Sequence, residues 1–213
     1  MDPIFPYGNT ETDYLTRRDP RLGRAIDAIG PIARPVCPDL FGALCDSIIG
    51  QQISNRAAAT VSARFRTLLG EVTPTRVLEA DPTALRGCGL SSRKVGYILS
   101  GAEAVQDGTL DIASLGDLSD AEVVRKLTAL PGVGVWTAEM LMIFSLCRPD
   151  VLSYDDLIVR RSLMRLHSLP EIDRKRFAAF REMYSPFGSV ASLYLWEMAA
   201  DPWRDNLLFT QDE

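Results

Sequence analysis

The sequence contains a single histidine, His167, and only four cysteines, Cys37, Cys45, Cys88 and Cys147, none of which belongs to a C-x-x-C pair. Zinc and iron–sulfur sites are built from clustered Cys and His ligands, so this scarcity argues against both kinds of site. Scattered cysteines of this kind are expected to be reduced, buried, small hydrophobic residues. The sequence therefore predicts no metal held by side chains and no cofactor.

Long apolar runs are also absent. No uninterrupted apolar segment approaches the roughly 20 residues that a membrane span requires. The first residues, MDPIFPYGNTETDY, carry two prolines and several acidic residues instead of a basic start followed by an apolar run. We therefore expect a cytoplasmic protein without a membrane partner.

The chain has no excess of positive charge, because 28 acidic residues outnumber 23 basic ones and the net charge is −5. A protein that coats nucleic acid without specificity is usually basic, so that class is disfavoured. A small basic footprint on an acidic body is still compatible with this charge. Any contact with DNA must then be confined to a small part of the surface.

Alternating strand patterns, solenoid repeats and low-complexity linkers are hard to find in the 213 residues. Helix-like segments separated by short Gly, Pro and Asp punctuation predict an all-α fold, organised as one two-lobed helical bundle over 1–213. The tail from Asp201 onward is predicted to be weakly ordered. The predicted helices are Pro20–Ile29, Asp39–Ile49, Asn55–Leu69, Thr75–Ala80, Pro82–Arg86, Ser92–Asp107, Asp120–Ala129, Val135–Leu146, Asp156–Leu166, Ile172–Met183 and Val190–Ala200.

The helix expected from Asp120 has the clearest start signal, since Ser119 and Glu122 form a capping box. It runs into LPGVGVWTAEMLMIFSL, where Gly132 and Gly134 separate two apolar segments. Both glycines can adopt positive φ, and without Cβ atoms they let the amides of the next helix face outward, where they can hold a phosphate. An ordinary corner between two packed helices is the alternative.

The pattern LPGVGxxTA, followed about twenty positions later by the acidic residues of SYDDLIVRR, resembles the helix-hairpin-helix superfamily of DNA glycosylases. SIIGQQISNRAAATVSARF and GLSSRKVGYI resemble its 3-methyladenine DNA glycosylase II branch, in a compact form without the N-terminal β domain. The resemblance runs from about Asp19 to Trp196. It implies an active-site cleft between a helix-hairpin-helix lobe, about 46–160, and a second lobe, about 1–45 with 161–213.

The resemblance implies a monofunctional DNA glycosylase of base excision repair that acts as a monomer. Such an enzyme flips alkylated purines of the 3-methyladenine and 7-methylguanine type out of double-stranded DNA and hydrolyses the N-glycosidic bond. A non-catalytic helix-hairpin-helix DNA-binding module is the alternative. A helical protein without DNA affinity would require the whole ordered set of motifs to be accidental.

Cleavage of a glycosidic bond passes through an oxocarbenium-like transition state that a carboxylate can stabilise. In the family pattern the catalytic Asp precedes a basic residue by five positions, which matches Asp156 with Arg161. Asp155 is then expected to be the N-cap of the following helix, and it is also the alternative catalytic residue. Without the hairpin upstream, both aspartates would be interpreted as helix caps.

Trp136 stands where family members that also cut the DNA backbone carry a lysine for Schiff-base formation, so no lyase step is implied. With Trp196 and Met140 it is expected to line the base pocket, although Trp196 is equally compatible with a core anchor between helices. Gly188 replaces an arginine that is frequent in the family. This replacement predicts a roomier or less charged site.

Gln52 matches the side chain that fills the gap left by the flipped base, and a polar turn before the next helix is the alternative for it. The DNA backbone is expected to bind the amides of Gly132 and Gly134 and the side chains of Arg93 and Lys94. In many relatives the hairpin carbonyls also hold a monovalent cation. For Arg160, Arg161 and Arg165, structural pairing with nearby acids is the favoured interpretation.

Overall fold

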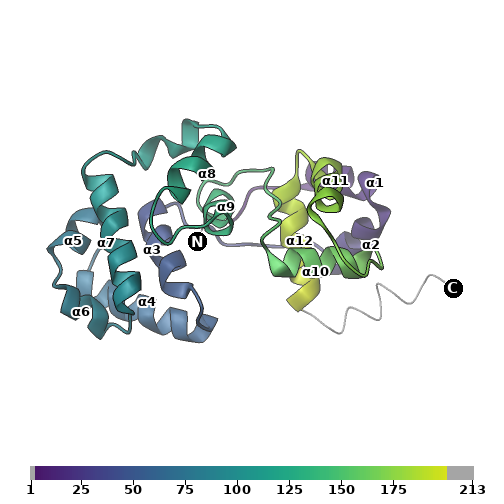
Figure 1. The fold of residues 1–213 in the computed structure, drawn as a ribbon. Coiled ribbons are helices and arrows are strands. Elements are labelled where there is room, and N and C mark those ends of the chain that lie inside the picture. The colour runs from purple at the N-terminus through teal and green to yellow at the C-terminus, as the bar shows by residue number, and fades with distance from the viewer. Residues whose placement is uncertain (1–2, 201–213) are drawn as a thin grey trace. The chain divides into compact units, whose positions relative to one another are not determined.

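The computed structural model describes residues 3–200. Within that range twelve α-helices and one 3₁₀ helix, η1, form all the regular structure apart from an isolated antiparallel bridge between Ile4 and Pro35 (Figure 1). The predicted all-α fold is confirmed. The weakly ordered tail predicted from Asp201 onward lies outside the described residues.

The chain divides into two compact units. Unit 1 contains the residues up to Val36 and those from Cys147 onward, with α1 (Asn9–Arg18), α2 (Pro20–Ile29), α10 (Leu157–Leu166), α11 (Arg174–Tyr184) and α12 (Gly188–Ala200). Unit 2 is Cys37–Leu146, with α3 (Leu40–Gly50), α4 (Asn55–Leu69), α5 (Pro74–Glu79), α6 (Pro82–Gly87), α7 (Ser92–Gln106), η1 (Ala113–Asp117), α8 (Asp120–Thr128) and α9 (Val135–Phe144).

These boundaries differ from the predicted lobe limits near 45 and 160. The whole of α3 belongs to unit 2 because it packs against α4, α7 and α9. The segment that precedes α10 belongs to unit 1, since α10 packs against α12. Asp156 is therefore a residue of unit 1 and not of the unit that carries the hairpin.

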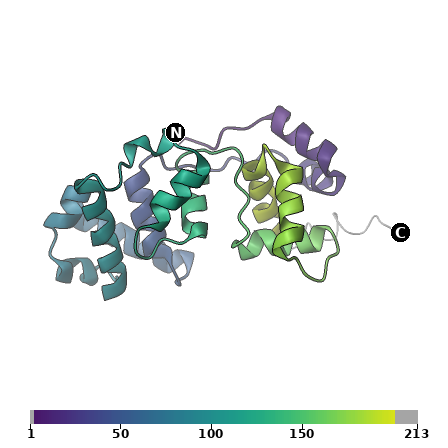
Figure 2. The same ribbon diagram turned by 45° about the horizontal axis from the view of Figure 1, so that its top comes forward.

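The core of unit 1 is organised around α12, which packs against α1, α2, α10 and α11 (Figures 1 and 2). Every residue of α12 from Gly188 to Leu195 is buried. A helix that is apolar on all sides can only be stable with neighbours on all sides. The surrounding helices present buried residues such as Leu15, Leu22 and Leu163.

The core of unit 2 is built on α3, whose buried residues include Leu44, Ile48 and Ile49. Two helices from later in the chain, α7 and α9, pack against α3, and α8 packs against α9. The end of α3, the start of α7 and the hairpin before α9 therefore belong to one packed unit.

The predicted helices are all present, and their ends shift by no more than two residues. The predicted capping box of α8 forms, with the Glu122 carboxylate accepting the Ser119 amide N–H at 3.0 Å. Two helices were missed, α1 and the short η1. The sequence of α1, NTETDYLTRR, is mostly polar and buries only Leu15, so it lacks the apolar periodicity from which helices are predicted.

All four cysteines are free. Cys45 and Cys88 are buried, as expected for small hydrophobic residues, but Cys37 and Cys147 are only half-buried. The expectation of four buried cysteines is therefore wrong for these two. Both lie next to a boundary between the units, where the chain leaves one core for the other.

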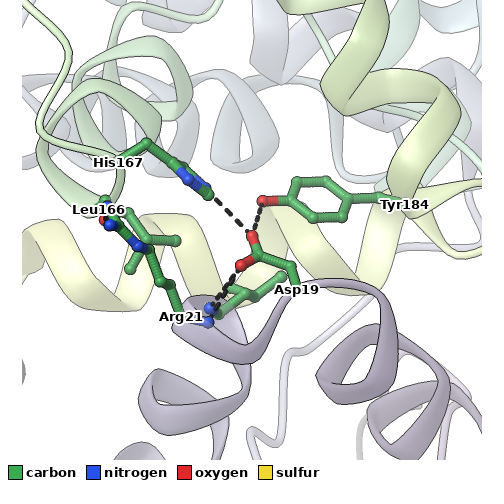
Figure 3. A network of polar contacts seen from close by, with 6 residues as sticks. Asp19, Arg21, Leu166, His167 and Tyr184 are labelled. Carbon is green, nitrogen blue, oxygen red and sulfur yellow. Dashed lines mark hydrogen bonds and ion pairs between the residues drawn. The ribbon is translucent and has the colours of Figure 1, made fainter.

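A buried carboxylate, Asp19, ties three helices of unit 1 together (Figure 3). Its Oδ1 accepts the amide N–H groups of Arg21 and Leu22 at 3.0 and 3.3 Å, which caps α2. Its Oδ2 accepts the Tyr184 hydroxyl at 2.6 Å from the end of α11 and lies 3.1 Å from Nε2 of His167, the residue after α10. Burial raises the pKa of Asp19, but the hydrogen bonds from His167 and Tyr184 and the attraction of His167 outweigh it, so this pKa lies below its ordinary value.

Replacing Asp19 should therefore destabilise the fold in a pH-dependent way. We expect Asp19→Ala to lower the free energy of unfolding at pH 7 by roughly 3 kcal/mol, because it removes a helix cap and leaves buried donors without an acceptor. A depressed folded-state pKa contributes stability that is complete above the unfolded pKa of about 4 and is lost as pH falls through the folded pKa. The difference between the two proteins in urea denaturation should thus shrink below about pH 4.

Asp27→Ala is the matched control, because Asp27 lies on the same helix but is exposed. It should change the free energy of unfolding by no more than about 0.5 kcal/mol. Equal effects of the two substitutions would contradict a special role for Asp19.

Candidate active site

Asp156 is a buried residue at the N-cap of α10, 5% exposed. Its Oδ1 accepts the amide N–H groups of Ile158 and Val159 at 2.8 and 2.9 Å. Its Oδ2 accepts the indole N–H of Trp196 at 3.1 Å. Donors to both oxygens fix the orientation of the carboxylate, and the two amides at the helix N-terminus favour a negative charge there.

The expected roles of the two aspartates in capping are reversed. Asp156 caps the helix, whereas Asp155 was predicted to do so. The Asp155 side chain is 46% exposed, and its Oδ1 lies 3.6 Å from a guanidinium nitrogen of Arg174. The helix begins one residue later than predicted, at Leu157, which moves the capping position from Asp155 to Asp156.

Three residues along one face of α11 hold the segment that leads to Asp156. The Arg181 guanidinium donates to the Leu152 carbonyl at 3.3 Å, and the Phe177 ring meets the Tyr154 ring edge-on, with centroids 5.2 Å apart. The Arg174 guanidinium lies 4.3 Å from the centroid of the same Tyr154 ring. These contacts restrain the backbone from 152 to 155 and therefore the position of the residue that follows.

Arginines on α10 were expected to pair with nearby acids. Arg160 instead places its guanidinium 5.0 Å from the centroid of the Tyr154 ring, a cation–π contact. Arg161 and Arg165 are exposed on the same helix. The Tyr154 ring therefore contacts guanidinium groups from both α10 and α11.

Two serines of α12 hold the preceding part of the same segment. Ser189 Oγ donates to the Arg148 carbonyl at 2.6 Å and accepts the Val151 amide N–H at 2.9 Å. Ser192 Oγ donates to the Val151 carbonyl at 3.0 Å. These positioning residues were missed from the sequence, where the only signal is a pair of serines three positions apart in an otherwise apolar helix.

Gly188 does not create the extra room that was predicted. Its amide donates to Asp150 Oδ1 at 3.1 Å, and a Cβ added to Gly188 would lie only 2.9 Å from that oxygen and 3.3 Å from the carbonyl carbon of Val151. The space of a side chain is already filled by the segment at 150 and 151. The prediction of a roomier site at this position is therefore wrong.

Trp196 is half-buried on α12, with its indole N–H directed at Asp156. It is thus anchored through its polar atom, and the interpretation as an apolar core anchor alone is incomplete. The first two residues of α10, Leu157 and Ile158, are large apolar residues that are 49% and 47% exposed. The carboxylate of Asp156 is therefore flanked in unit 1 by an indole and by exposed aliphatic side chains.

The hairpin in unit 2 joins α8 to α9 through Leu130–Gly134. Gly132 has φ +81°, and a Cβ at this position would lie 2.1 Å from a carbon of the Tyr97 ring, so only glycine fits. Gly134 has an extended backbone with φ −92° and is the N-cap of α9, so of the two glycines only Gly132 uses the freedom to adopt positive φ. An added Cβ at Gly134 would meet no atom within 4 Å, and Gly134, Val135 and Trp136 are all exposed, so the start of α9 lies at the surface of unit 2.

The other predicted site residues also belong to unit 2. Trp136, in the first turn of α9, is 43% exposed, whereas Met140, one turn later, is buried at 8%. Gln52 is exposed and has φ +57°, and Arg93 is exposed at the start of α7. Together with the hairpin glycines, Gln52 and Arg93 line a cavity of about 420 Å³.

Lys94, predicted to contact DNA, donates its ammonium N–H groups to the carbonyls of Ile49 and Gln51, both at 2.7 Å. Burial lowers the pKa of Lys94. Two of the hydrogen bonds that this ammonium group can donate are therefore made within unit 2.

Residues 3–200 contain no cluster of His, Cys, Asp and Glu that could hold a metal ion. In the same range no helix has both the length and the apolar character that crossing a bilayer requires.

Comparison with known proteins identifies the family. Residues 45–186 match the HhH-GPD superfamily of base excision DNA repair proteins. The chain is 36% identical over 159 residues to DNA-3-methyladenine glycosylase 1 of Schizosaccharomyces pombe, an alignment that covers 72% of this chain and 70% of that relative.

Solved structures agree with this match. The crystal structure of a DNA-3-methyladenine glycosidase from Bacillus halodurans superposes with a TM-score of 0.82 and 36% identity, covering 92% of both chains. A 3-methyladenine DNA glycosylase of Schizosaccharomyces pombe in complex with abasic DNA superposes with a TM-score of 0.80 and 31% identity, covering 91% of this chain and 98% of the other. The resemblance found in the sequence is confirmed, and the chain belongs to the HhH-GPD superfamily of base excision DNA repair proteins, among the relatives of the 3-methyladenine DNA glycosylases.

Proposed function

We propose that this protein is a monofunctional DNA glycosylase that removes N3- and N7-alkylated purines from double-stranded DNA, with Asp156 as the catalytic residue. The observation that carries the proposal is the buried carboxylate of Asp156, held by two helix amides and an indole N–H. The names of the similar proteins, which refer to 3-methyladenine, support the choice of substrate.

The chemistry follows from the charge of the reactants. As the bond between sugar and base breaks, positive charge develops on the sugar, and a fixed carboxylate stabilises that charge. An alkylated purine already carries a positive charge and leaves as a neutral base, so it needs little help from a proton donor. Water then adds to the sugar and leaves an abasic site. Asp156 accepts hydrogen bonds on both oxygens, which suits the role of charge stabiliser.

In unit 1 the indole of Trp196, which donates to Asp156, is the proposed π-face for a cationic base. In unit 2 the exposed indole of Trp136 is a second proposed aromatic contact with DNA. Met140 supplies a polarisable apolar contact. The amides at the start of α9, where Gly134 and Val135 are exposed, are the proposed phosphate grip, and Gln52 is the proposed side chain that fills the gap in the duplex.

Trp136 occupies the position at which the resemblance implies a lysine in members that cut the DNA backbone. An indole cannot form a Schiff base, so the proposed reaction ends at the abasic site. The hairpin carbonyls are the proposed place for a monovalent cation, and no step of the reaction depends on one. The Gly132 carbonyl also accepts the side-chain amide N–H of Gln51 at 2.8 Å, which uses one of its two lone pairs.

Asp156→Asn should lower the single-turnover rate of base release from alkylated duplex DNA by at least about 100-fold, because a neutral amide cannot stabilise the developing charge. Asparagine is also a good helix cap, so the melting temperature should change little. Asp155→Asn is the matched control and should retain the rate within about threefold. Loss of activity in the Asp155 variant alone would make Asp155 the catalytic residue. If the wild type binds DNA but releases no base, the protein is a non-catalytic DNA-binding module.

Trp196→Phe tests the contact to Asp156, because phenylalanine keeps an aromatic face but, with its smaller ring, cannot donate to the carboxylate. We expect kcat to fall about tenfold with KM nearly unchanged, as for the loss of one hydrogen bond to a charged group. In the Asp156→Asn background the same substitution should have a much smaller effect, since its target is gone. A raised KM with unchanged kcat would instead assign Trp196 to base stacking alone.

A further inference from the structure

Three parts of unit 2 that the sequence places far apart meet around one cavity. They are the loop 51–54 between α3 and α4, the first turns of α7, and the hairpin before α9. The cavity of about 420 Å³ is lined from all three, including by Gln52, Lys94 and Gly134. The loop 51–54 is called the wedge loop below, because it carries Gln52.

Lys94 holds the end of α3 and the start of the wedge loop. Its ammonium group donates to the carbonyls of Ile49 and Gln51, both at 2.7 Å. The C-terminal end of a helix exposes carbonyls without internal partners and carries a partial negative charge, so a cation there is well placed. The lysine therefore closes α3 at the point where the wedge loop begins.

The second of these carbonyls belongs to the peptide group that joins Gln51 to Gln52. Fixing that peptide plane restrains the φ angle of Gln52, which is +57°. A left-handed conformation is unfavourable for a residue with a Cβ atom and persists only where its surroundings hold it. The bond from Lys94 is a local contact that can hold Gln52 in this conformation.

The side chain of Gln51 extends the connection to the hairpin. Its Nε2 donates to the Gly132 carbonyl at 2.8 Å. The same glycine packs against the ring of Tyr97, which lies three residues after Lys94 and on the same face of α7. One turn of α7 therefore contacts the hairpin through Tyr97 and the wedge loop through Lys94, and Gln51 links the hairpin to the wedge loop directly.

We propose that Lys94 and Gln51 are positioning residues that lock the wedge loop to the hairpin. The hydrogen bonds of Lys94 and Gln51 are together called the brace. When the hairpin binds a phosphate, the brace fixes the point at which Gln52 enters the duplex, a set distance along the DNA from that phosphate. The inference rests on the proposed function, and it replaces the expected role of Lys94 as a phosphate contact.

The test is Lys94→Met, which keeps the aliphatic stem and removes the ammonium group. On a duplex with a paired alkylated purine, kcat should fall about tenfold, because Gln52 is then slightly misplaced relative to the DNA. With the lesion opposite an abasic-site analogue, no partner base has to be opened, and the loss should shrink to about twofold. Gln51→Leu should give the same pattern, and the double variant should be no worse than Lys94→Met by more than about twofold.

Salt dependence separates the brace from a phosphate contact. The slope of log Kd against log salt concentration should be the same for Lys94→Met and the wild type, whereas loss of a phosphate contact reduces it by about one. Arg93→Met, at the exposed neighbouring position, is the comparison for such a reduction. A reduced slope for Lys94→Met, with an equal loss of rate on both substrates, would overturn the brace.

Lys94→Arg, which can still donate to both carbonyls, should recover most of the rate. If this variant has an unchanged melting temperature but does not recover the rate, the brace is also contradicted.

Failure of the brace is distinguishable from failure of the proposed function. A 2-aminopurine placed beside the lesion reports unstacking through its fluorescence, without requiring base release. The wild type should increase this fluorescence and Lys94→Met should increase it less. If the wild type unstacks DNA more than Lys94→Met does but frees no base, the proposed function is wrong and the brace stands. If both proteins free base and unstack DNA equally, only the brace is wrong.

Discussion

The hydrogen bonds to the carboxylate of Asp156 are the interactions on which the account of this protein depends. Two amides at the start of α10 hold one oxygen, and the indole of Trp196 on α12 holds the other. A charge stabiliser must be oriented before the reaction begins, because its advantage over water lies in not having to reorganise. The packing of α10 and α11 against α12 fixes the elements that carry Asp156 and Trp196, as the proposed role of Asp156 requires.

The segment before Asp156 is fixed from two directions. Ser189 and Ser192 of α12 bind the backbone near Val151, while Arg181 of α11 binds the Leu152 carbonyl. An irregular segment is a less precise support than a helix unless its neighbours hold it, and these hydrogen bonds hold this segment at several points. This arrangement explains why a helix as apolar as α12 contains two serines: both are buried and both have backbone partners.

Unit 2 shows how an acidic protein can be equipped for DNA. A net charge of −5 offers little general attraction to phosphates, so the contact has to come from local geometry. Backbone amides contribute such contacts without adding charged side chains, and those at the start of α9, where Gly134 and Val135 are exposed, are proposed for this role. The hydrogen bonds of Lys94 and Gln51 then connect that point to the loop that carries Gln52.

Much of this could be predicted from the sequence, because helix periodicity, capping residues and the LPGVG turn are local signals. The helices were found to within two residues, but α1 was missed since its only buried residue, Leu15, gives no periodic pattern. The filled space at Gly188 and the internal bonds of Lys94 depend on partners distant in the chain, residues 150 and 151 for the first and 49 and 51 for the second. Such partners are set by tertiary packing, and no local rule reveals them.

The most direct test of the central claim is to identify the products when the wild-type protein is incubated with a methylated DNA duplex. Chromatography with mass detection should find free 3-methyladenine and 7-methylguanine. The strand should remain intact with an abasic site, and borohydride should trap no covalent complex. Binding without release of any base, or a trapped adduct with a cut strand, would contradict the assignment of a monofunctional glycosylase.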